Sequence, residues 1–201
     1  MSDIKQRLRQ ATTLPGPPSS DYDLNPAAAG GAPGGMLRDA AVLIACRDGR
    51  SGPEVILTKR SSRLKHHPGQ IAFPGGKVDA GDDGPVAAAL REAREEIGLP
   101  EAAVEILGIL PSHETVTGFS VTPVLGWIAA PFDPVPEEGE VEEVFAVPLS
   151  HVLAPTRFSI EGRRWRGQRR RFYVVPYGPY YIWGATARML RALADRMERC
   201  G

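Results

Sequence analysis

Residues 91 to 99 read Arg91-Glu92-Ala93-Arg94-Glu95-Glu96-Ile97-Gly98-Leu99 and carry the clearest chemical pattern in this 201-residue chain. On an α-helix, Glu92, Glu95 and Glu96 stand at positions i, i+3 and i+4, so they share one face and their like charges repel. A divalent cation removes that repulsion, and carboxylate oxygens suit Mg²⁺ or Mn²⁺. The pattern therefore predicts a helix that presents three carboxylates to a metal ion.

The neighbouring residues predict how this helix sits in the fold. The helical pattern runs from residue 85 to residue 97, and Gly98 is placed to end it as a C-terminal cap. Arg91 precedes Glu95 by four residues and is placed to hold it by a charge-assisted hydrogen bond. One apolar stripe is expected to face the core, and it consists of Val86, Leu90, Ala93 and Ile97.

Short apolar or β-branched runs flank the helix and predict strands. They cover residues 40–46, 54–60, 104–110, 121–130, 144–149 and 170–177, and an amphipathic helix is expected over 183–199. Strands interspersed with helices predict an α/β fold whose mixed sheet is covered on both faces. We expect this domain over 37–201, after a Pro/Gly-rich and partly irregular N-terminal arm over 1–36. In that arm, Ile4 and Leu8 suit one or two turns of helix.

The charge balance restricts the classes of function. The chain has 24 Lys and Arg residues against 24 Asp and Glu residues, which argues against bulk attraction to nucleic acid or to an anionic membrane. Its longest apolar run, residues 40–46, is far shorter than the ~20 residues that span a bilayer. Cys46 and Cys200 show no disulfide or metal-binding spacing. We therefore expect a cytoplasmic protein, with its oligomeric state open and a homodimer among the alternatives.

A glycine and an acid ahead of the helix complete a known pattern. Gly76 and Asp83, followed by the run from Arg91 to Leu99, resemble the signature of the Nudix hydrolases. The acid is Asp rather than Glu, and the gap between it and the glycine is one residue longer than usual. The resemblance implies a Nudix-type α-β-α sandwich with a mixed β-sheet, pyrophosphohydrolase activity, and a Mg²⁺ or Mn²⁺ ion bound by Glu92, Glu95 and Glu96.

A second group of residues looks like the motif of the coenzyme A pyrophosphatase branch of that family. It comprises residues 57–61, Lys65, Gly69 and residues 73–76. An Arg usually occupies the position of Lys65, which keeps the charge but loses the planar fork for phosphate. The resemblance implies cleavage of coenzyme A or acyl-coenzyme A to 3′-phosphoadenosine 5′-phosphate and (acyl) 4′-phosphopantetheine. The residues expected to bind this diphosphate substrate are Arg60, Lys65, Gly69, Gly75, Gly76 and Phe119.

The group that accepts the proton of the attacking water is the least defined part of the site. We expect Arg91 and Glu95 to take part in catalysis, together with Glu142 from a later loop. Other loop residues stay open as the base, namely Glu140, Glu114 and His113. For His113 we favour the simpler interpretation, a loop residue with a local hydrogen bond.

An arginine-rich cluster over residues 163–171 has three interpretations. It is a solvated hairpin turn, a contact for the phosphates of coenzyme A, or a surface for nucleic acid.

Two alternatives to coenzyme A cleavage remain. One is hydrolysis of another nucleoside diphosphate derivative such as ADP-ribose, and the other is non-catalytic binding of a nucleotide or RNA by a Nudix-fold protein. The intact set of three glutamates argues against the non-catalytic alternative.

Overall fold

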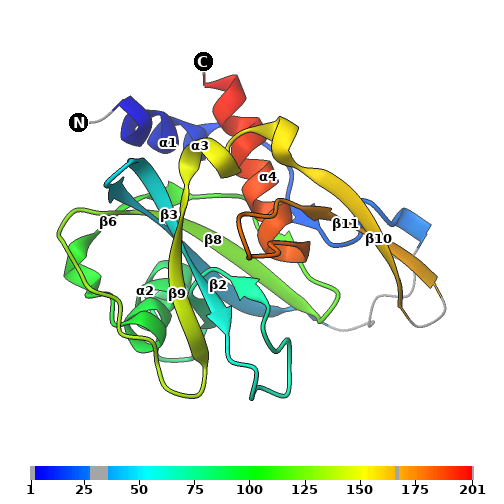
Figure 1. The fold of residues 1–201 in the computed structure, drawn as a ribbon, viewed down its shortest axis with the longest axis horizontal. Coiled ribbons are helices and arrows are strands. Elements are labelled where there is room, and N and C mark those ends of the chain that lie inside the picture. The colour runs from blue at the N-terminus through cyan, green and yellow to red at the C-terminus, as the bar shows by residue number, and fades with distance from the viewer. Residues whose placement is uncertain (1–2, 28–35, 166–167, 201) are drawn as a thin grey trace.

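The computed structural model describes residues 3–27, 36–165 and 168–200. The strands are β1 Ser19–Ser20, β2 Arg38–Gly49, β3 Gly52–Arg60, β4 Ile71–Ala72, β5 Gly75–Lys77, β6 Val104–Ile109, β7 His113–Glu114, β8 Phe119–Ile128, β9 Val141–Pro148, β10 Ser159–Trp165 and β11 Gln168–Val174. The helices are α1 Asp3–Thr13, α2 Gly84–Ile97, α3 Leu149–Val152 and α4 Gly184–Arg199, with 3₁₀ turns at Glu101–Ala103 and Pro155–Arg157. Figure 1 shows a twisted sheet between these helices.

Strand β2 is the axis of the main sheet. It pairs in parallel with β8 and antiparallel with both β3 and β5. The remaining antiparallel neighbours lie further out, with β9 and β4 on β3, and β6 and β7 on β8. The predicted mixed sheet is therefore confirmed.

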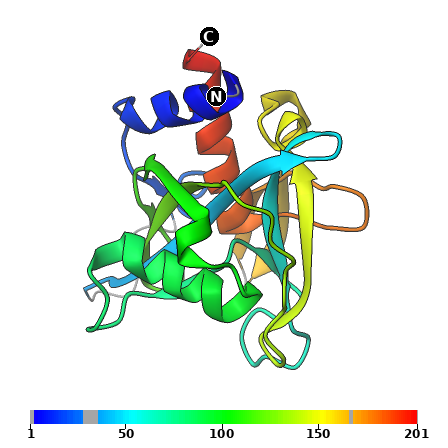
Figure 2. The same cartoon turned by 90° about the vertical axis from the view of Figure 1, so that its left-hand side faces the viewer.

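The sheet separates two apolar cores. On β2, Leu43 and Ala45 belong to the core under α2, whereas Ile44 and Cys46 belong to the core under α1, α3 and α4. This alternation follows from the two-residue period of a strand, and it requires both faces to be covered. Figure 2 shows α2 on one side and the other helices on the other side. The α-β-α sandwich predicted from the sequence is confirmed.

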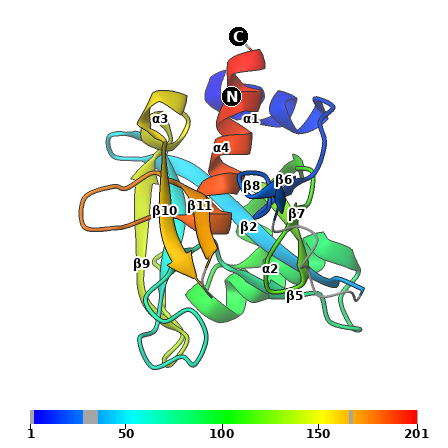
Figure 3. The same cartoon turned by 90° about the vertical axis from the view of Figure 1, so that its right-hand side faces the viewer.

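The predicted strands and the C-terminal helix all occur, with bounds shifted by a few residues. Strand β10 was not predicted. It pairs with β11 in a separate two-stranded sheet beside α4, as Figure 3 shows. Its sequence shows no alternation of apolar and polar residues, because Ile160 is exposed and the residues from Glu161 to Arg164 are charged or glycine. Residues 166 and 167 of the arginine-rich cluster lie outside the described residues. Among the described helices, none is long and apolar enough to cross a membrane.

The N-terminal segment is more regular than the sequence predicted. Helix α1 has 11 residues rather than one or two turns, and its Leu8 and Ala11 are fully buried. Lys5 donates a 2.5 Å hydrogen bond to Glu105 of β6, and Arg9 pairs with the same carboxylate. Further along, β1 pairs in parallel with β7. Residues 3–20 thus pack onto the domain that follows them.

Candidate active site

Helix α2 carries the three glutamates and has the predicted ends. Pro85 lies in the first turn, where its missing N–H is not needed. Gly98 follows the last turn with a φ of 69° and donates its N–H to the carbonyl of Arg94 at 3.0 Å. A left-handed φ favours glycine, so the residue after the carboxylates also ends their helix.

The buried face of α2 differs from the predicted stripe. Its buried residues are Ala88, Ala89, Ala93, Glu96 and Ile97. The predicted Val86 and Leu90 are only half-buried, because the small alanines bring a neighbouring face of the helix against the sheet. The three glutamates consequently differ in environment. Glu96 is 5% exposed, whereas the side chain of Glu95 is 51% exposed.

Arg91 organises the polar side of the helix. Its Nη1 donates to Glu92 at 3.1 Å and to Glu95 at 3.0 Å, which confirms the predicted bond to Glu95. Its Nη2 donates to the carbonyl of Lys77 at 3.1 Å. Two further bonds go to Asp82, so five acceptors match the five N–H donors of a guanidinium. All five donors of Arg91 are thus used within the protein, an arrangement that favours a positioning role over direct contact with a substrate.

The acid that Arg91 holds is Asp82. Its carboxylate accepts both bonds side by side and also accepts the backbone N–H of Asp79 at 2.8 Å. These bonds lower the pKa of Asp82. Asp83, which the resemblance aligned with the acid of the signature, is the N-cap of α2 and makes no side-chain capping bond. Arg91 thus pairs with the acid one position before the one that the resemblance aligned.

Glu92 lies directly over the glycine of the signature. A Cβ atom added to Gly76 would overlap the carboxylate of Glu92. Burial is the main cause that raises the pKa of Glu92, and Arg91 opposes this effect. Any larger residue at position 76 would therefore displace the carboxylate of Glu92 from the place it has here.

Glu96 is the most deeply buried of the three glutamates. Its Oε2 accepts the backbone N–H of Gly75 at 3.1 Å. Burial raises its pKa to about 7, against the bond from Gly75, and the charges of Glu92 and Glu140 raise it further. The positive charge of Arg60 acts in the opposite direction. Three carboxylates and one arginine therefore share this part of the structure.

The donor set fits a hard divalent cation. The charge of Glu140 raises the pKa of both Glu92 and Glu96, and the charge of Glu92 also raises the pKa of Glu96. A divalent cation would relieve this repulsion. Within the residues that the structure describes, no three acidic, imidazole or thiol groups are already close enough together to hold a metal ion. Glu95, also expected as a ligand, instead pairs with Arg91 and lies 3.9 Å from Arg94. Glu92 and Glu96 are thus the two glutamates of the triad that face the glycine strand, β5 (Gly75–Lys77).

The two acidic residues at the start of β9 differ in their surroundings. Glu142, expected as a catalytic residue, accepts a 2.6 Å bond from Lys59 and a 3.3 Å bond from the N–H of Ser62. Those bonds lower its pKa, which makes it a weaker base. Glu140 acts electrostatically on both Glu92 and Glu96. Of the two, Glu140 is the one that the fold places with the carboxylate helix.

The expected substrate-binding loop closes on itself above β3. Arg60 donates its N–H to the carbonyl of Gln70 at 2.9 Å and accepts the N–H of Gly69 at 3.1 Å. The Nε of Arg60 is buried and has no hydrogen-bond partner among the described residues. Lys65 stands exposed on the loop. The fold thus brings Arg60 near Glu96 and leaves Lys65 on the solvent-exposed part of the loop.

The remaining expected residues border the glycine strand. Gly75 pairs with Val42 of β2 at a φ of 155°, and an added Cβ would overlap the carbonyl of Ala41. Phe119 begins β8 opposite Arg38, whose guanidinium lies 4.0 Å from its ring. Since Ala40, two residues further along β2, pairs with Lys77, Phe119 lies near that end of the glycine strand.

His113 is a buried residue of β7 rather than the loop residue that we expected. It is 0% exposed, and its Nδ1 lies 2.9 Å from the hydroxyl of Ser19. Its Nε2 lies 3.2 Å from Asp21, whose other oxygen accepts the N–H of Val116. The local hydrogen bond that we expected is therefore a contact with the N-terminal segment, which no local pattern reveals.

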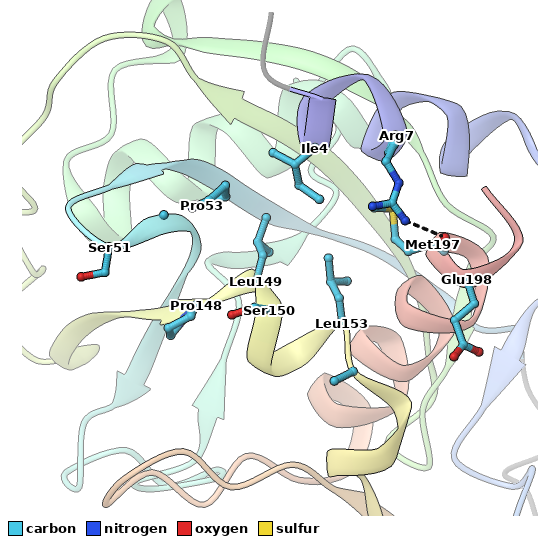
Figure 4. Close-up of a pocket in the computed structure, with 12 residues that line it drawn as sticks. Ile4, Arg7, Ser51, Pro53, Pro148, Leu149, Ser150, Leu153, Met197 and Glu198 are labelled. Atoms are coloured by element: carbon cyan, nitrogen blue, oxygen red, sulfur yellow. Dashed lines mark hydrogen bonds between the residues drawn. The ribbon is translucent and has the colours of Figure 1, made fainter. Parts of the chain in front are cut away.

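A hollow of about 490 Å³ lies at the other end of the molecule, between α1, the β2–β3 turn, α3 and the end of α4. Figure 4 shows Leu149, Leu153 and Met197 around it. None of the three glutamates lines this hollow, so it is not part of the candidate active site.

Comparisons with known proteins agree with this geometry. A family model described as "NUDIX domain" matches residues 36–166. The "Uncharacterized Nudix hydrolase NudL" of Enterobacter sp. (strain 638) is 46% identical over 157 residues, which cover 78% of this chain and 81% of the relative. The protein of the same name from Citrobacter koseri shows the same identity and coverage.

Solved structures show the same fold. The MutT protein from Methanosarcina mazei Go1 superposes with a TM-score of 0.52 at 20% sequence identity. The match covers 83% of this chain and 96% of that protein. At this identity the likeness concerns the fold alone.

Proposed function

This chain belongs to the Nudix hydrolase family, and from that premise we propose that it cleaves the diphosphate of coenzyme A or acyl-coenzyme A. The products would be 3′-phosphoadenosine 5′-phosphate and (acyl) 4′-phosphopantetheine. That the chain is a pyrophosphohydrolase follows from the family. The choice of substrate is our own inference from residues 57–76.

One observation carries the choice of substrate. Arg60, in the segment that resembles the coenzyme A pyrophosphatase motif, acts electrostatically on Glu96 of the carboxylate helix. Its buried Nε has no acceptor among the residues that the structure describes, and a phosphate oxygen would supply one. Lys65 and Gly69 lie on the loop that Arg60 closes. The coenzyme-type motif therefore adjoins the carboxylate site.

The mechanism assigns a task to each part of the site. We propose that Glu92 and Glu96 hold a divalent ion, with Glu95 as a further ligand once it leaves Arg91. A bound divalent ion neutralises a diphosphate and lowers the pKa of a water molecule. Mg²⁺ or Mn²⁺ suits the all-oxygen donor set. Gly75 and Gly76 leave room for the Ala41 carbonyl and the Glu92 carboxylate beside them, and Arg60 and Lys65 bind the phosphates of the substrate.

The proton of the attacking water needs an acceptor near the carboxylate helix. Glu140 meets this requirement better than Glu142, whose carboxylate is already bonded to Lys59 and Ser62. Glu95 becomes an acceptor only if it does not bind the metal. Arg91 contributes by fixing Glu92 and Glu95, since all of its donors are used within the protein.

A product screen by mass spectrometry tests the proposal. Purified protein is incubated with coenzyme A, acetyl-coenzyme A, NADH and ADP-ribose, each with and without Mn²⁺. We expect metal-dependent release of 4′-phosphopantetheine at the highest kcat/KM of the set. The variant Glu96→Gln serves as the control for a contaminating hydrolase, because it removes a proposed ligand with little change in size. Faster cleavage of ADP-ribose than of coenzyme A would overturn the proposal.

Lys65 motivates the second candidate, hydrolysis of another nucleoside diphosphate derivative such as ADP-ribose. Lysine presents a point charge where the coenzyme A branch usually has a planar guanidinium. The same screen separates the two candidates.

We further propose that the enzyme works in the cytoplasm, where the thiols of Cys46 and Cys200, both free in the structure, stay reduced.

A further inference from the structure

Three aromatic rings surround one arginine beside the β10–β11 hairpin. The guanidinium carbon of Arg163 lies 5.4 Å from the ring centre of Tyr181, 5.7 Å from that of Trp183 and 6.0 Å from that of Phe172. The rings of Phe172 and Trp183 meet edge to face at 5.1 Å. At these distances the π-systems attract the cation and restrain the plane of its guanidinium.

This aromatic–arginine cluster, formed by Arg163, Phe172, Tyr181 and Trp183, faces solvent. The three rings are half-buried and Arg163 is exposed. Glu161, two residues before Arg163, accepts a 2.7 Å bond from the hydroxyl of Tyr181. Because Arg163 is exposed, part of its guanidinium remains accessible to a planar ligand.

The charge around the cluster is positive and not neutralised from within the chain. In the described parts of the chain, no carboxylate lies within 4.0 Å of the guanidinium nitrogens of Arg163, Arg164, Arg169 or Arg171. The strand pairing places Arg163 and Phe172 on one face of the hairpin and Arg164, Arg169 and Arg171 on the other face. The feature that suits a nucleobase is therefore the plane of Arg163 held over aromatic rings.

The cluster adjoins the elements of the candidate active site. Tyr180, next to Tyr181, stacks on Phe145 of β9 at 3.6 Å and donates a 2.5 Å bond to Glu143. On the other side, Thr186 at the start of α4 donates a 3.0 Å bond to the carbonyl of Ile71, at the end of the substrate-binding loop. Figure 1 shows this turn (orange) between β9 and α4. A continuous strip of protein therefore joins the cluster to the loop that Arg60 closes.

We propose that the aromatic–arginine cluster is the subsite for the nucleobase of the substrate's nucleotide half. The base stacks on the outer face of the Arg163 guanidinium, which the three rings hold in place. This inference rests on the proposed function in one respect, namely that the substrate contains a nucleotide joined through a diphosphate.

Equilibrium binding without metal tests the subsite separately from the chemistry. The probes are adenosine 3′,5′-bisphosphate, which carries the base, and 4′-phosphopantetheine, which does not. Arg163→Lys keeps the charge but removes the stacking plane. We expect it to weaken binding of adenosine 3′,5′-bisphosphate by about 5- to 100-fold, the range for one stacked base, and to leave 4′-phosphopantetheine unchanged. Arg50→Lys, in the exposed β2–β3 turn, is the matched control and should change neither affinity.

Three results would overturn the subsite. The first is an unchanged affinity of Arg163→Lys for adenosine 3′,5′-bisphosphate. The second is an equal loss for both probes, which would indicate a purely electrostatic role. The third is Arg163-dependent binding of a 20-nucleotide single-stranded RNA together with Arg163-independent binding of the mononucleotide. If coenzyme A proves not to be a substrate, the same experiment with ADP-ribose still tests the subsite, so the two proposals fail separately.

Discussion

The guanidinium of Arg91 binds Asp82 through two parallel hydrogen bonds, from Nε to Oδ1 at 2.9 Å and from Nη2 to Oδ2 at 3.0 Å. The same side chain also bonds to the carbonyl of Lys77 and to Glu92 and Glu95. It thereby joins the end of the glycine strand, the turn before α2 and the carboxylates of α2. Parallel bonds of this kind are strong and directional, so Asp82 fixes the orientation of Arg91.

Asp82→Asn should lower kcat/KM by up to about 10²-fold, because Arg91 would lose a paired acceptor and the carboxylates it positions would shift. Asp83→Asn is the matched control. Asp83 makes no capping bond through its side chain, so its variant should retain nearly all activity. Steady-state hydrolysis of the best diphosphate substrate measures both. Equal losses in the two variants would show that the acid of the signature acts through the charge of the turn rather than through Arg91.

Gly76→Ala should weaken metal binding by about 10- to 100-fold, the usual effect of disturbing a group that orients a ligand. The added methyl group would overlap the carboxylate of Glu92 and push it aside. Gly81→Ala is a clean comparison, because a Cβ at Gly81 meets no atom within 4 Å. Titration with Mn²⁺ followed by electron paramagnetic resonance measures both affinities. Unchanged affinity in Gly76→Ala would mean that Glu92 does not bind the metal.

The sequence predicted the carboxylate helix well because its signals are local. The spacing of the glutamates, Pro85 and Gly98 all act within a few turns, and the structure has the helix at Gly84–Ile97. The rotation of the helix could not be predicted, because it depends on how closely the alanines approach β2. For that reason Glu92, Glu95 and Glu96 seemed equivalent in the sequence, although only Glu96 is buried.

The contacts that the sequence missed all join distant residues. Asp82 and Asp83 are the same type of residue, and only the turn decides which of them reaches Arg91. His113 bonds to Ser19 and Asp21, more than 90 residues earlier in the chain. Composition suggested an irregular segment there, since Gly and Pro are frequent, but it does not report which surfaces the segment meets.

Glu140→Gln should reduce kcat more than Glu142→Gln. Glu140 acts electrostatically on Glu92 and Glu96, whereas Glu142 is held by Lys59 and its pKa is lowered. Removal of a general base typically costs about 10²- to 10⁴-fold in rate. The pH dependence of kcat at saturating Mn²⁺ provides the second readout, because loss of the base removes the acidic limb. A larger loss in Glu142→Gln would restore that residue as the proton acceptor.

Cys46 should make the protein less stable at alkaline pH. Burial raises the pKa of its thiol to about 12, whereas an unfolded thiol ionises near about 8.5. Above about pH 8.5 the unfolded state loses this proton and the folded state keeps it, so the free energy of unfolding falls by up to about 1.4 kcal/mol per pH unit. Urea unfolding at pH 8 and pH 10, compared between the parent protein and Cys46→Ala, isolates this contribution. Identical pH slopes would contradict it.

Leu8→Ala should destabilise the domain even though residue 8 lies in the segment whose composition suggested an arm. Leu8 is 0% exposed in the core that also contains residues of α4, and truncating a buried leucine costs about 2–5 kcal/mol. Leu37→Ala serves as the comparison, because Leu37 is 36% exposed and should cost little. Urea unfolding measures both variants. If Leu8→Ala left the free energy of unfolding unchanged, helix α1 would be dispensable and the folding unit would begin after it. A single cooperative transition at lower urea would instead place α1 inside the folding unit.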